Sequence, residues 1–141
     1  MLFSPGRETG EVSETVSTVL VLFGLLQVKH MLADYFLQTP RMLAARGAYL
    51  HLGRAQHAGV HAAGSVAALA LVGAAPVFIV WAVLCEWLVH FHVDWGKARF
   101  TEAHELYPTQ SSFWWAMGVD QALHQFTYIA LVWAAVGFGA I

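Results

Sequence analysis

The sequence predicts an all-α protein, an integral membrane four-helix bundle. Of the 141 residues, 58% are hydrophobic and 11% are charged, and the mean hydropathy is +0.57. Ordinary soluble domains have roughly 25% charged residues, so this chain has too few charges to cover a water-exposed surface. Four apolar stretches are separated by turn residues, and a chain of this length has room for about four spans of roughly 20 residues each. We therefore expect one transmembrane domain over residues 1–141.

The first predicted span covers residues 16–38, an apolar stretch that Pro40 closes because proline disfavours a continuing helix. Residues 1–12 contain one proline and two glycines and are expected to form a polar exposed arm. The first 14 residues carry three glutamates and one arginine. A cleavable signal peptide has a basic start instead, so we expect the first span to be retained.

The second predicted span covers residues 54–72, after a loop over residues 39–53 that has room for one short helical turn. This span is rich in alanine and glycine, with Gly59, Ala63 and Ala67 at four-residue spacing. Small residues at that spacing let membrane helices approach closely. We expect this helix to be the most tightly packed of the four.

The last two predicted spans cover residues 77–99 and 112–138. A short uncharged turn precedes the first of them, and a polar loop over residues 100–111 separates the two. The chain has a single cysteine, Cys85, inside an apolar run, which favours a buried thiol. One cysteine excludes an intrachain disulfide.

The cations gather at one end of the predicted bundle. The two long loops and the helix ends beside them hold Arg41, Arg46, Arg54, Lys97 and Arg99. By the positive-inside rule, both long loops are cytoplasmic and both termini lie outside. The seven Lys and Arg residues form no basic patch, so we expect no nucleic-acid partner. Membrane lipids are the expected surroundings, and a homo-oligomer is left open.

Every predicted span carries ionisable residues four positions apart, a spacing that places them on one face of a helix. They are His30, Asp34, His57, His61, Glu86, His90, Asp94, Asp120 and His124. At about 1.5 Å per residue, all of them lie in the cytoplasmic half of the bundle. Asp34, His57 and Asp94 lie about one turn from the cytoplasmic end, whereas Glu86 and His124 lie about three turns deep.

Ionisable groups inside a bilayer are costly, so they must neutralise one another, reach water or bind a cation. Histidine and carboxylate ligands suit zinc, iron or manganese, and helical bundles hold two metal ions in this way. We predict two divalent transition-metal ions, zinc in preference to iron or manganese. The predicted metal ligands are His30, Asp34, His57, His61, His90, Asp94, Asp120 and His124.

Glu86 is the candidate catalytic residue because it lies deepest of the three ionisable residues that are spaced four apart on the third span, Glu86, His90 and Asp94. Three roles are open for Glu86: a general base, a hydrogen-bond partner of a histidine that binds the metal, or a metal ligand itself. Lys29 adjoins His30 but lies about 100° around the helix. We expect Lys29 to extend along the helix surface toward the membrane interface.

Four segments in order carry a resemblance to a known family. They are His30-x-x-x-Asp34-Tyr35-Phe36-Leu37-Gln38-Thr39, His57-x-x-x-His61, His90-x-x-x-Asp94-x-x-Lys97 and Asp120-Gln121-x-x-His124. With them the chain resembles the small bacterial and phage membrane proteins grouped as domain of unknown function 3307, and the first and the last are the two specific motifs. The resemblance extends over roughly residues 20–130 and implies a multi-pass protein of the bacterial inner membrane. That family is distantly similar to membrane-bound metal-dependent hydrolases, which implies hydrolysis. Glu86 lies outside both motifs.

The expected activity is metal-dependent hydrolysis of a lipid or amphipathic substrate. Two metal ions lower the pKa of a bridging water and polarise an ester or phosphoryl oxygen, and Glu86 carries the proton. One alternative is a di-iron oxidase or hydroxylase, since the same ligands hold iron. The other is a proton or divalent-cation translocating module. Translocation needs a polar path to both faces, and the outer halves of the predicted spans offer little polar lining.

Overall fold

The structure, a computed structural model, describes residues 5–44 and 46–141. Over these residues the chain is helical and contains no strand. The elements are α1 (Pro5–Met31), the π-helical turn η1 (Leu32–Phe36), α2 (Pro40–Leu43), α3 (Leu52–Leu71), α4 (Pro76–Ala103) and α5 (Ser111–Gly137). The predicted all-α class is confirmed.

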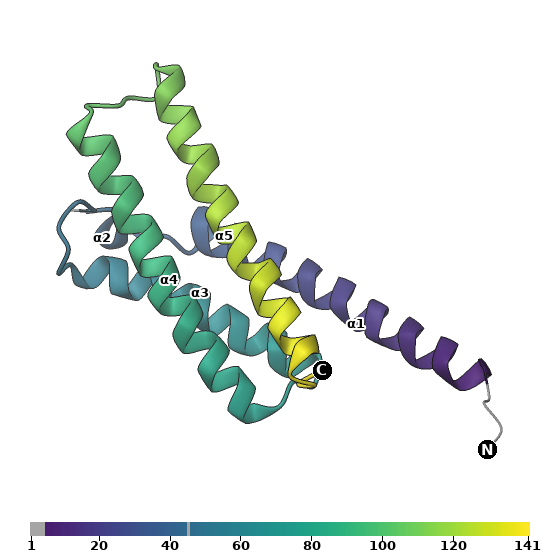
Figure 1. Cartoon of the computed structure of the whole chain (residues 1–141). Helices are drawn as coiled ribbons and strands as arrows, with labels where there is room; N and C mark the ends of the chain where they lie inside the picture. The colour runs from purple at the N-terminus through teal and green to yellow at the C-terminus, as the bar shows by residue number, and fades with distance from the viewer. Residues whose placement is uncertain (1–4, 45) are drawn as a thin grey trace.

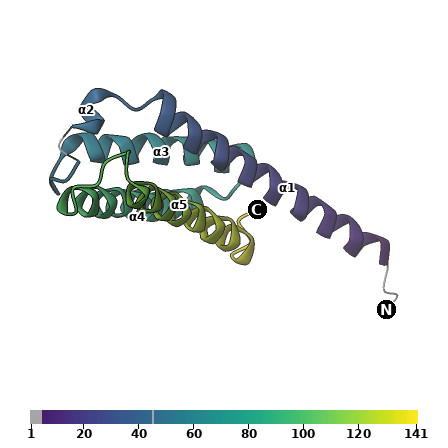
Figure 2. The same cartoon turned by 90° about the horizontal axis from the view of Figure 1, so that it is seen from above.

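The four long helices surround a shared interior. α1 packs against α3 and α5, while α4 packs against α3 and α5 from the other side. The α2 segment and the α4–α5 connection lie at one end of the molecule, and the α3–α4 turn and the C-terminus lie at the other (Figure 1). There, the N–H of Ala75 donates to the carbonyl of Ala140 at 3.0 Å. The first half of α1 extends beyond the other helices (Figure 2).

The ends of the helices follow from local sequence. Pro40 and Pro76 occupy the first positions of α2 and α4, where the missing N–H of proline costs nothing. The Thr39 hydroxyl caps α2 by accepting from the N–H of Met42 at 3.4 Å. α2 is the single helical turn expected in the first long loop. The helices expected over 54–72, 77–99 and 112–138 correspond to α3, α4 and α5, with α4 continuing to Ala103.

The beginning of the chain differs from the expected polar arm. α1 already begins at Pro5, so residues 5–12 are helical, and residues 1–4 of the expected arm lie outside the described residues. Proline is well suited to the first turn of a helix, and acidic residues near a helix N-terminus interact favourably with its dipole. Prediction gave too much weight to Gly6 and Gly10 as helix breakers.

The packing face of α3 also differs from the expected one. Ala63 and Ala67 of the small-residue stripe are exposed, and Gly59 is half-buried. The buried face carries the two histidines of α3 instead, together with Ala58, Ala62, Ser65, Ala68 and Leu69. A polar imidazole gains more by facing polar partners in the interior than a methyl group loses by facing outward. The histidines therefore set the rotation of α3.

Cys85 is exposed, so the expected buried thiol is wrong. Its neighbour Glu86 is buried, with a relative exposure of 2%. Successive residues on an α-helix point about 100° apart, so the inward position of Glu86 turns Cys85 toward the outer surface of α4. The carboxylate occupies the interior position.

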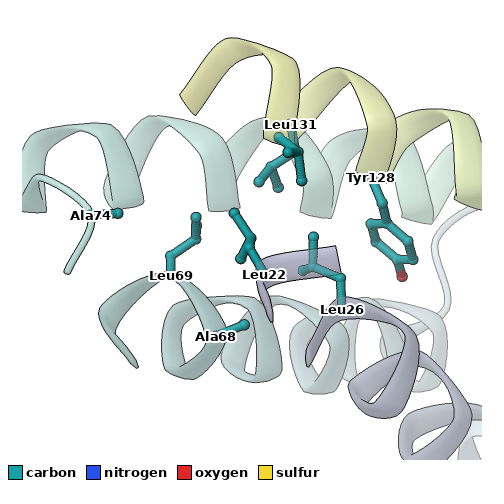
Figure 3. Close-up of a cluster of buried hydrophobic side chains, with 8 residues drawn as sticks. Leu22, Leu26, Ala68, Leu69, Ala74, Tyr128 and Leu131 are labelled. Atoms are coloured by element: carbon teal, nitrogen blue, oxygen red, sulfur yellow. The ribbon is translucent and has the colours of Figure 1, made fainter. Parts of the chain in front are cut away.

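A cluster of apolar side chains fills the interior at the end opposite the long loops. It comprises Leu22, Leu26, Ala68, Leu69, Ala74, Tyr128, Leu131 and Val132. Figure 3 shows Ala74 and Tyr128 at opposite ends of this cluster. The polar residues of the predicted site begin beyond the Tyr128 end, because the Tyr128 hydroxyl lies 2.9 Å from His30 Nδ1.

Among the described residues, two segments are long and apolar enough to cross a membrane. They are Val12–Phe36, which combines most of α1 with η1, and Pro76–Ala103, which is α4. Length and composition are the basis of this statement. The chain therefore has two helices that meet the simplest criterion for a membrane span.

Candidate metal centre

The predicted site residues come together in the interior, in the half of the molecule near the long loops. His30, His57, His61, Glu86, His90, Asp120 and His124 are buried, and Asp34 and Asp94 are half-buried. They come from all four long helices and from η1. Eight of them, all except Glu86, form a connected cluster of carboxylates and imidazoles, described here as the aspartate–histidine cluster.

Asp34 is surrounded by three histidines. Its Oδ1 lies 3.0 Å from Nε2 of His61 and 3.3 Å from Nε2 of His57. Its Oδ2 lies 3.3 Å from Nε2 of His30. One carboxylate thus faces imidazoles from two helices.

Asp94 has a similar arrangement on the other side of the interior. Its Oδ1 lies 3.3 Å from Nε2 of His124, and its Oδ2 lies 3.4 Å from Nε2 of His90. The same Oδ2 lies 3.6 Å from Nε2 of His57. His57 therefore faces both aspartates and joins the two halves of the cluster.

The cluster contains three groups of three potential metal ligands. Two of them share no residue, and they are His30, Asp34 and His61, and His90, Asp94 and His124. The third, His57, His61 and His90, shares one histidine with each of these. Within each group the ligand atoms lie within 4.8 Å of one another, and the rings of His61 and His90 have centroids 3.9 Å apart. The first two groups each offer two imidazoles and a carboxylate, a donor set that suits a divalent transition metal.

A π-helical turn delivers Asp34 to this cluster. In η1, the N–H of Leu37 donates to the carbonyl of Leu32 at 2.9 Å, five residues back. This wider turn interrupts the α-helical register immediately after His30 and Met31. Such turns are frequent at functional sites. The four-residue spacing of His30 and Asp34 could not reveal it.

Asp120 lies at the edge of the cluster. Its Oδ1 is 3.7 Å from Nε2 of His124, and its Oδ2 accepts from the Gln121 amide at 3.5 Å. Asp120 also lines a cavity of about 350 Å³ with Asp34, His57 and Asp94. Residues of the first long loop, the end of α4 and the start of α5 complete the lining, so the cavity connects the cluster with the loop end. Three of these four residues, Asp34, His57 and Asp94, are the ones predicted to lie about one helical turn from the end that carries the long loops.

Several buried polar atoms of the cluster have no hydrogen-bond partner among the described residues. They are Nδ1 of His57 and His61, both ring nitrogens of His90, and Oδ1 of Asp120. Buried polar atoms normally find a partner, and exceptions in a native structure call for an explanation such as an ion or a water. Bound metal would account for His90 Nε2 and Asp120 Oδ1 directly.

The segment that contains the cluster matches a known protein family. A family described as a protein of unknown function, DUF3307, has a sequence model that matches residues 21–139. The chain belongs to this family. No curated protein and no solved structure matches the chain. The DUF3307 segment contains all nine predicted site residues, so the cluster lies within the family domain.

Glu86 stands apart from the aspartate–histidine cluster of this DUF3307 chain. Its Oε1 forms an ion pair and hydrogen bond with the ammonium of Lys29, and its Oε2 is buried without a partner among the described residues. Within residues 5–44 and 46–141, no hydrogen bond or ion pair joins Glu86 to a histidine of the cluster. Its assignment as the catalytic residue stays a prediction, and its contacts favour a role in positioning Lys29.

Lys29 does not lie on the helix surface as expected. Its relative exposure is 8%, its ammonium donates to the carbonyl of His61 at 3.3 Å, and it lies 4.4 Å from the centroid of the Tyr128 ring. Gly64 makes room for it, because a Cβ there would lie 3.1 Å from the Lys29 Cβ. In the sequence, a lysine one position before a predicted ligand histidine gives little indication that the lysine is buried. The indication becomes useful only when Glu86, a buried acid on another helix, is considered as its partner.

Two further residues hold His30: Tyr128, which the sequence did not single out, and Gln121, for which a hydrogen bond to a ligand or substrate and a packing hydrogen bond were equal expectations. Nδ1 of His30 and the hydroxyl of Tyr128 are 2.9 Å apart, and Nε2 of His30 lies 3.0 Å from Oε1 of Gln121. A histidine that binds metal through Nε2 carries its proton on Nδ1 and donates it to a neighbour. In the structure, Gln121 Oε1 can only accept, so Nε2 carries the proton and the Tyr128 hydroxyl donates to Nδ1. Metal binding through Nε2 would require the other tautomer, in which Nδ1 donates to the Tyr128 oxygen.

The remaining histidines lie outside the cluster. His92 is exposed and its Nε2 lies 3.0 Å from the Tyr49 hydroxyl, consistent with an interfacial position. His104 is exposed at the end of α4. These residues provide matched controls for the histidines of the cluster.

Proposed function

We propose that the chain is a multi-pass membrane protein whose four long helices all cross the bilayer. The support is an inverted distribution of polarity. The interior holds the cluster, Lys29 and Glu86, while large apolar side chains such as Leu20, Trp81 and Trp133 are 66%, 66% and 77% exposed. Continuous apolar surface on a small protein indicates contact with lipid or another protein.

The proposed location is the bacterial inner membrane, with the long loops in the cytoplasm and both termini outside. The cations Arg41, Arg46, Arg54, Lys97 and Arg99 all belong to the loop end, and the positive-inside rule assigns that end to the cytoplasm. The cavity of the cluster is lined by residues of the same end. Access from the cytoplasmic leaflet follows from this orientation.

The proposed activity rests on a dinuclear metal centre in the aspartate–histidine cluster. The observation that carries the proposal is a pair of ligand groups, one around Asp34 and one around Asp94, that share no residue and are joined by His57. Imidazole and carboxylate donors without a thiolate favour zinc over softer metals, and iron or manganese fit the same donors. Two bound ions would also compensate the carboxylates of Asp34, Asp94 and Asp120.

The reaction proposed for this centre is hydrolysis of a lipid or amphipathic substrate. When bound, the metal ions would activate a water molecule and polarise an ester or phosphoryl oxygen. The chain itself supplies a one-sided cavity, since the apolar cluster from Leu22 to Val132 fills the interior on the far side. That filling gives no support to the translocation alternative, which requires a polar path to both faces.

Two pockets between α4 and α5 support a substrate with an acyl chain. One, of about 630 Å³, is lined mainly by apolar residues of the two helices. The other, of about 640 Å³, lies nearer the long loops and includes Lys97 and Asp120, which also line the cavity of the cluster. An acyl chain in this second pocket would bring its headgroup to the cavity at these two residues.

Elemental analysis of the detergent-purified chain tests the metal centre. We expect tightly bound transition metal in the wild type, and a clear loss in Asp94→Asn and His61→Ala, which each remove a ligand from a different group. His92→Ala, which changes an exposed histidine, should retain wild-type metal content. Zinc in a colourless protein supports hydrolysis, whereas iron with a visible absorption band supports the oxidase alternative. Wild-type protein without transition metal overturns the proposal.

A further inference from the structure

Three cations line the cavity beside the aspartate–histidine cluster. Arg54 comes from the first turn of α3, Arg46 from the preceding loop and Lys97 from α4. In the described part of the chain, the ion pairs that involve lysine or arginine are Lys29 with Glu86 and Arg99 with Glu102. Asp94 and Glu102 line the same cavity, but within the described residues neither forms an ion pair with Arg54, Arg46 or Lys97.

Arg54 is held rigidly at this cavity. Its relative exposure is 3%, and its guanidinium stacks over the Phe91 ring, with Cζ 5.2 Å from the ring centroid. Nη1 donates to the carbonyl of Tyr49 at 3.2 Å. Nη2 is buried and has no hydrogen-bond partner among the described residues. One side of the guanidinium is thus fixed by the protein, while the other side lacks an acceptor.

A buried guanidinium with an unsatisfied donor is costly unless an anion completes it. The planar fork of arginine matches the oxygens of phosphate, and bonds between charged groups are stronger than neutral ones. Lys97 and Arg46 are half-buried in the same cavity and add positive charge without a fixed geometry. This combination favours an oxyanion ligand with several acceptor oxygens.

We propose that Arg54, with Arg46 and Lys97, forms an anion subsite for the phosphoryl group of a phosphate-ester substrate. The inference rests on the proposed metal centre in one respect. Asp34, Asp94, Asp120 and Glu102 line the same cavity; Glu102 pairs with Arg99, and the three aspartates would repel an anion unless bound cations neutralise them. A phosphate has enough oxygens to meet metal ions and Arg54 together, whereas an uncharged ester would leave the arginine unsatisfied.

The phosphate can belong to a lipid headgroup or to a soluble ester, and the shared chemistry is the phosphate ester. The test therefore uses two probes, inorganic phosphate and a short-chain phosphatidic acid, with the full chain in an uncharged detergent. Binding of each probe is measured by titration calorimetry, and metal content is determined on the same samples. Short-chain diacylglycerol, which lacks the phosphate, is the reference for the acyl chains.

The variants separate the three cations from general loss of structure. We expect Arg54→Gln to weaken phosphate binding at least tenfold, Arg54→Lys to weaken it less, and Lys97→Gln to weaken it severalfold. The control Arg41→Gln removes an exposed cation of α2 that does not line the cavity and should bind as the wild type does. Because Arg54 also holds the Tyr49 carbonyl, helix content is checked by circular dichroism. If Arg54→Gln does not fold, Arg54→Lys and Lys97→Gln decide the question.

The subsite is overturned if the wild type binds neither anionic probe, or if the Arg54 and Lys97 variants bind like Arg41→Gln. If the protein contains metal but shows no such phosphate binding, the subsite is wrong and the metal centre is still supported. Protein without metal whose phosphate binding needs Arg54 overturns the metal centre and supports the subsite. Phosphatidic acid binding at least tenfold tighter than phosphate assigns the ester to a lipid, and equal binding assigns it to a soluble substrate.

Discussion

Lys29 and Glu86 form a buried ion pair between α1 and α4, two helices that otherwise make no close contact. The pair lies next to the apolar cluster, because Lys29 also contacts the ring of Tyr128. It joins opposite sides of the interior at the level just beyond the aspartate–histidine cluster. A charge pair in this position ties the rotation of α1 to that of α4.

Removing one member of this pair should destabilise the protein strongly. Glu86→Ala leaves the Lys29 ammonium buried without its partner, a change that typically costs about 3–5 kcal/mol. The double variant Lys29→Met with Glu86→Leu should recover most of that loss, since apolar groups of similar volume need no partner. Unfolding in mixed detergent, followed by circular dichroism, measures both.

The exposed pair of Arg99 and Glu102 is the control for this prediction. Their side chains are 56% and 53% exposed, and the shortest distance between charged atoms is 3.6 Å. Such surface pairs contribute about 0–1 kcal/mol, so Arg99→Ala should change stability little. Equal effects of Glu86→Ala and Arg99→Ala would show that the buried pair is unimportant.

Periodicity predicted the four long helices. It also predicted which ionisable residues face the interior, because ionisable side chains on one face of an otherwise apolar helix avoid an apolar environment. The depth estimate separated Glu86 from Asp34 and Asp94, but it placed His124 level with Glu86, whereas Nε2 of His124 lies 3.3 Å from Oδ1 of Asp94. It could not show that Lys29 would turn inward, since that depends on the space left by Gly64 and on the carboxylate of another helix. The π-turn η1 and the Tyr128 contact also depend on tertiary structure.

The small residues of α3 illustrate a second limit of the sequence. Gly59, Ala63 and Ala67 have the spacing of a packing motif, but Ala58, Ala62 and Ser65 have a comparable composition one face away. The choice between the two faces is made by His57 and His61, whose partners lie on other helices. Pairwise patterns within one helix cannot weigh such partners.

Chelation of the proposed metal ions should lower stability reversibly. The ligands come from α1, η1, α3, α4 and α5, so bound metal stabilises the native packing by mass action, by about 2.7 kcal/mol when free metal is 100 times its Kd. We expect a lower Tm after dialysis against a strong chelator and its recovery with zinc. Magnesium should fail to restore it because imidazoles are poor magnesium ligands. A Tm unaffected by chelator in metal-containing protein would contradict this prediction.

Tyr128→Phe should weaken metal binding more than it weakens the fold. The hydroxyl is the partner of His30 Nδ1, and loss of such a partner typically costs about 10–100-fold in metal affinity. The apolar ring remains in the cluster with Leu26 and Leu69, so stability should fall by only about 1 kcal/mol. Competition with a chromogenic chelator measures the affinity. Tyr107→Phe, at an exposed tyrosine, is the control and should bind metal as the wild type does.

The orientation in the membrane predicts which cysteines a membrane-impermeant maleimide reaches. The native Cys85 lies on an exposed apolar face and is first replaced by alanine. Ser13→Cys, near the start of α1, should then react in intact spheroplasts, because the positive-inside rule places that end outside. His104→Cys, in the connection between α4 and α5, should react only after lysis. The opposite pattern would place the cavity and its cations on the outer face, and the proposed substrate would then have to come from the outer leaflet.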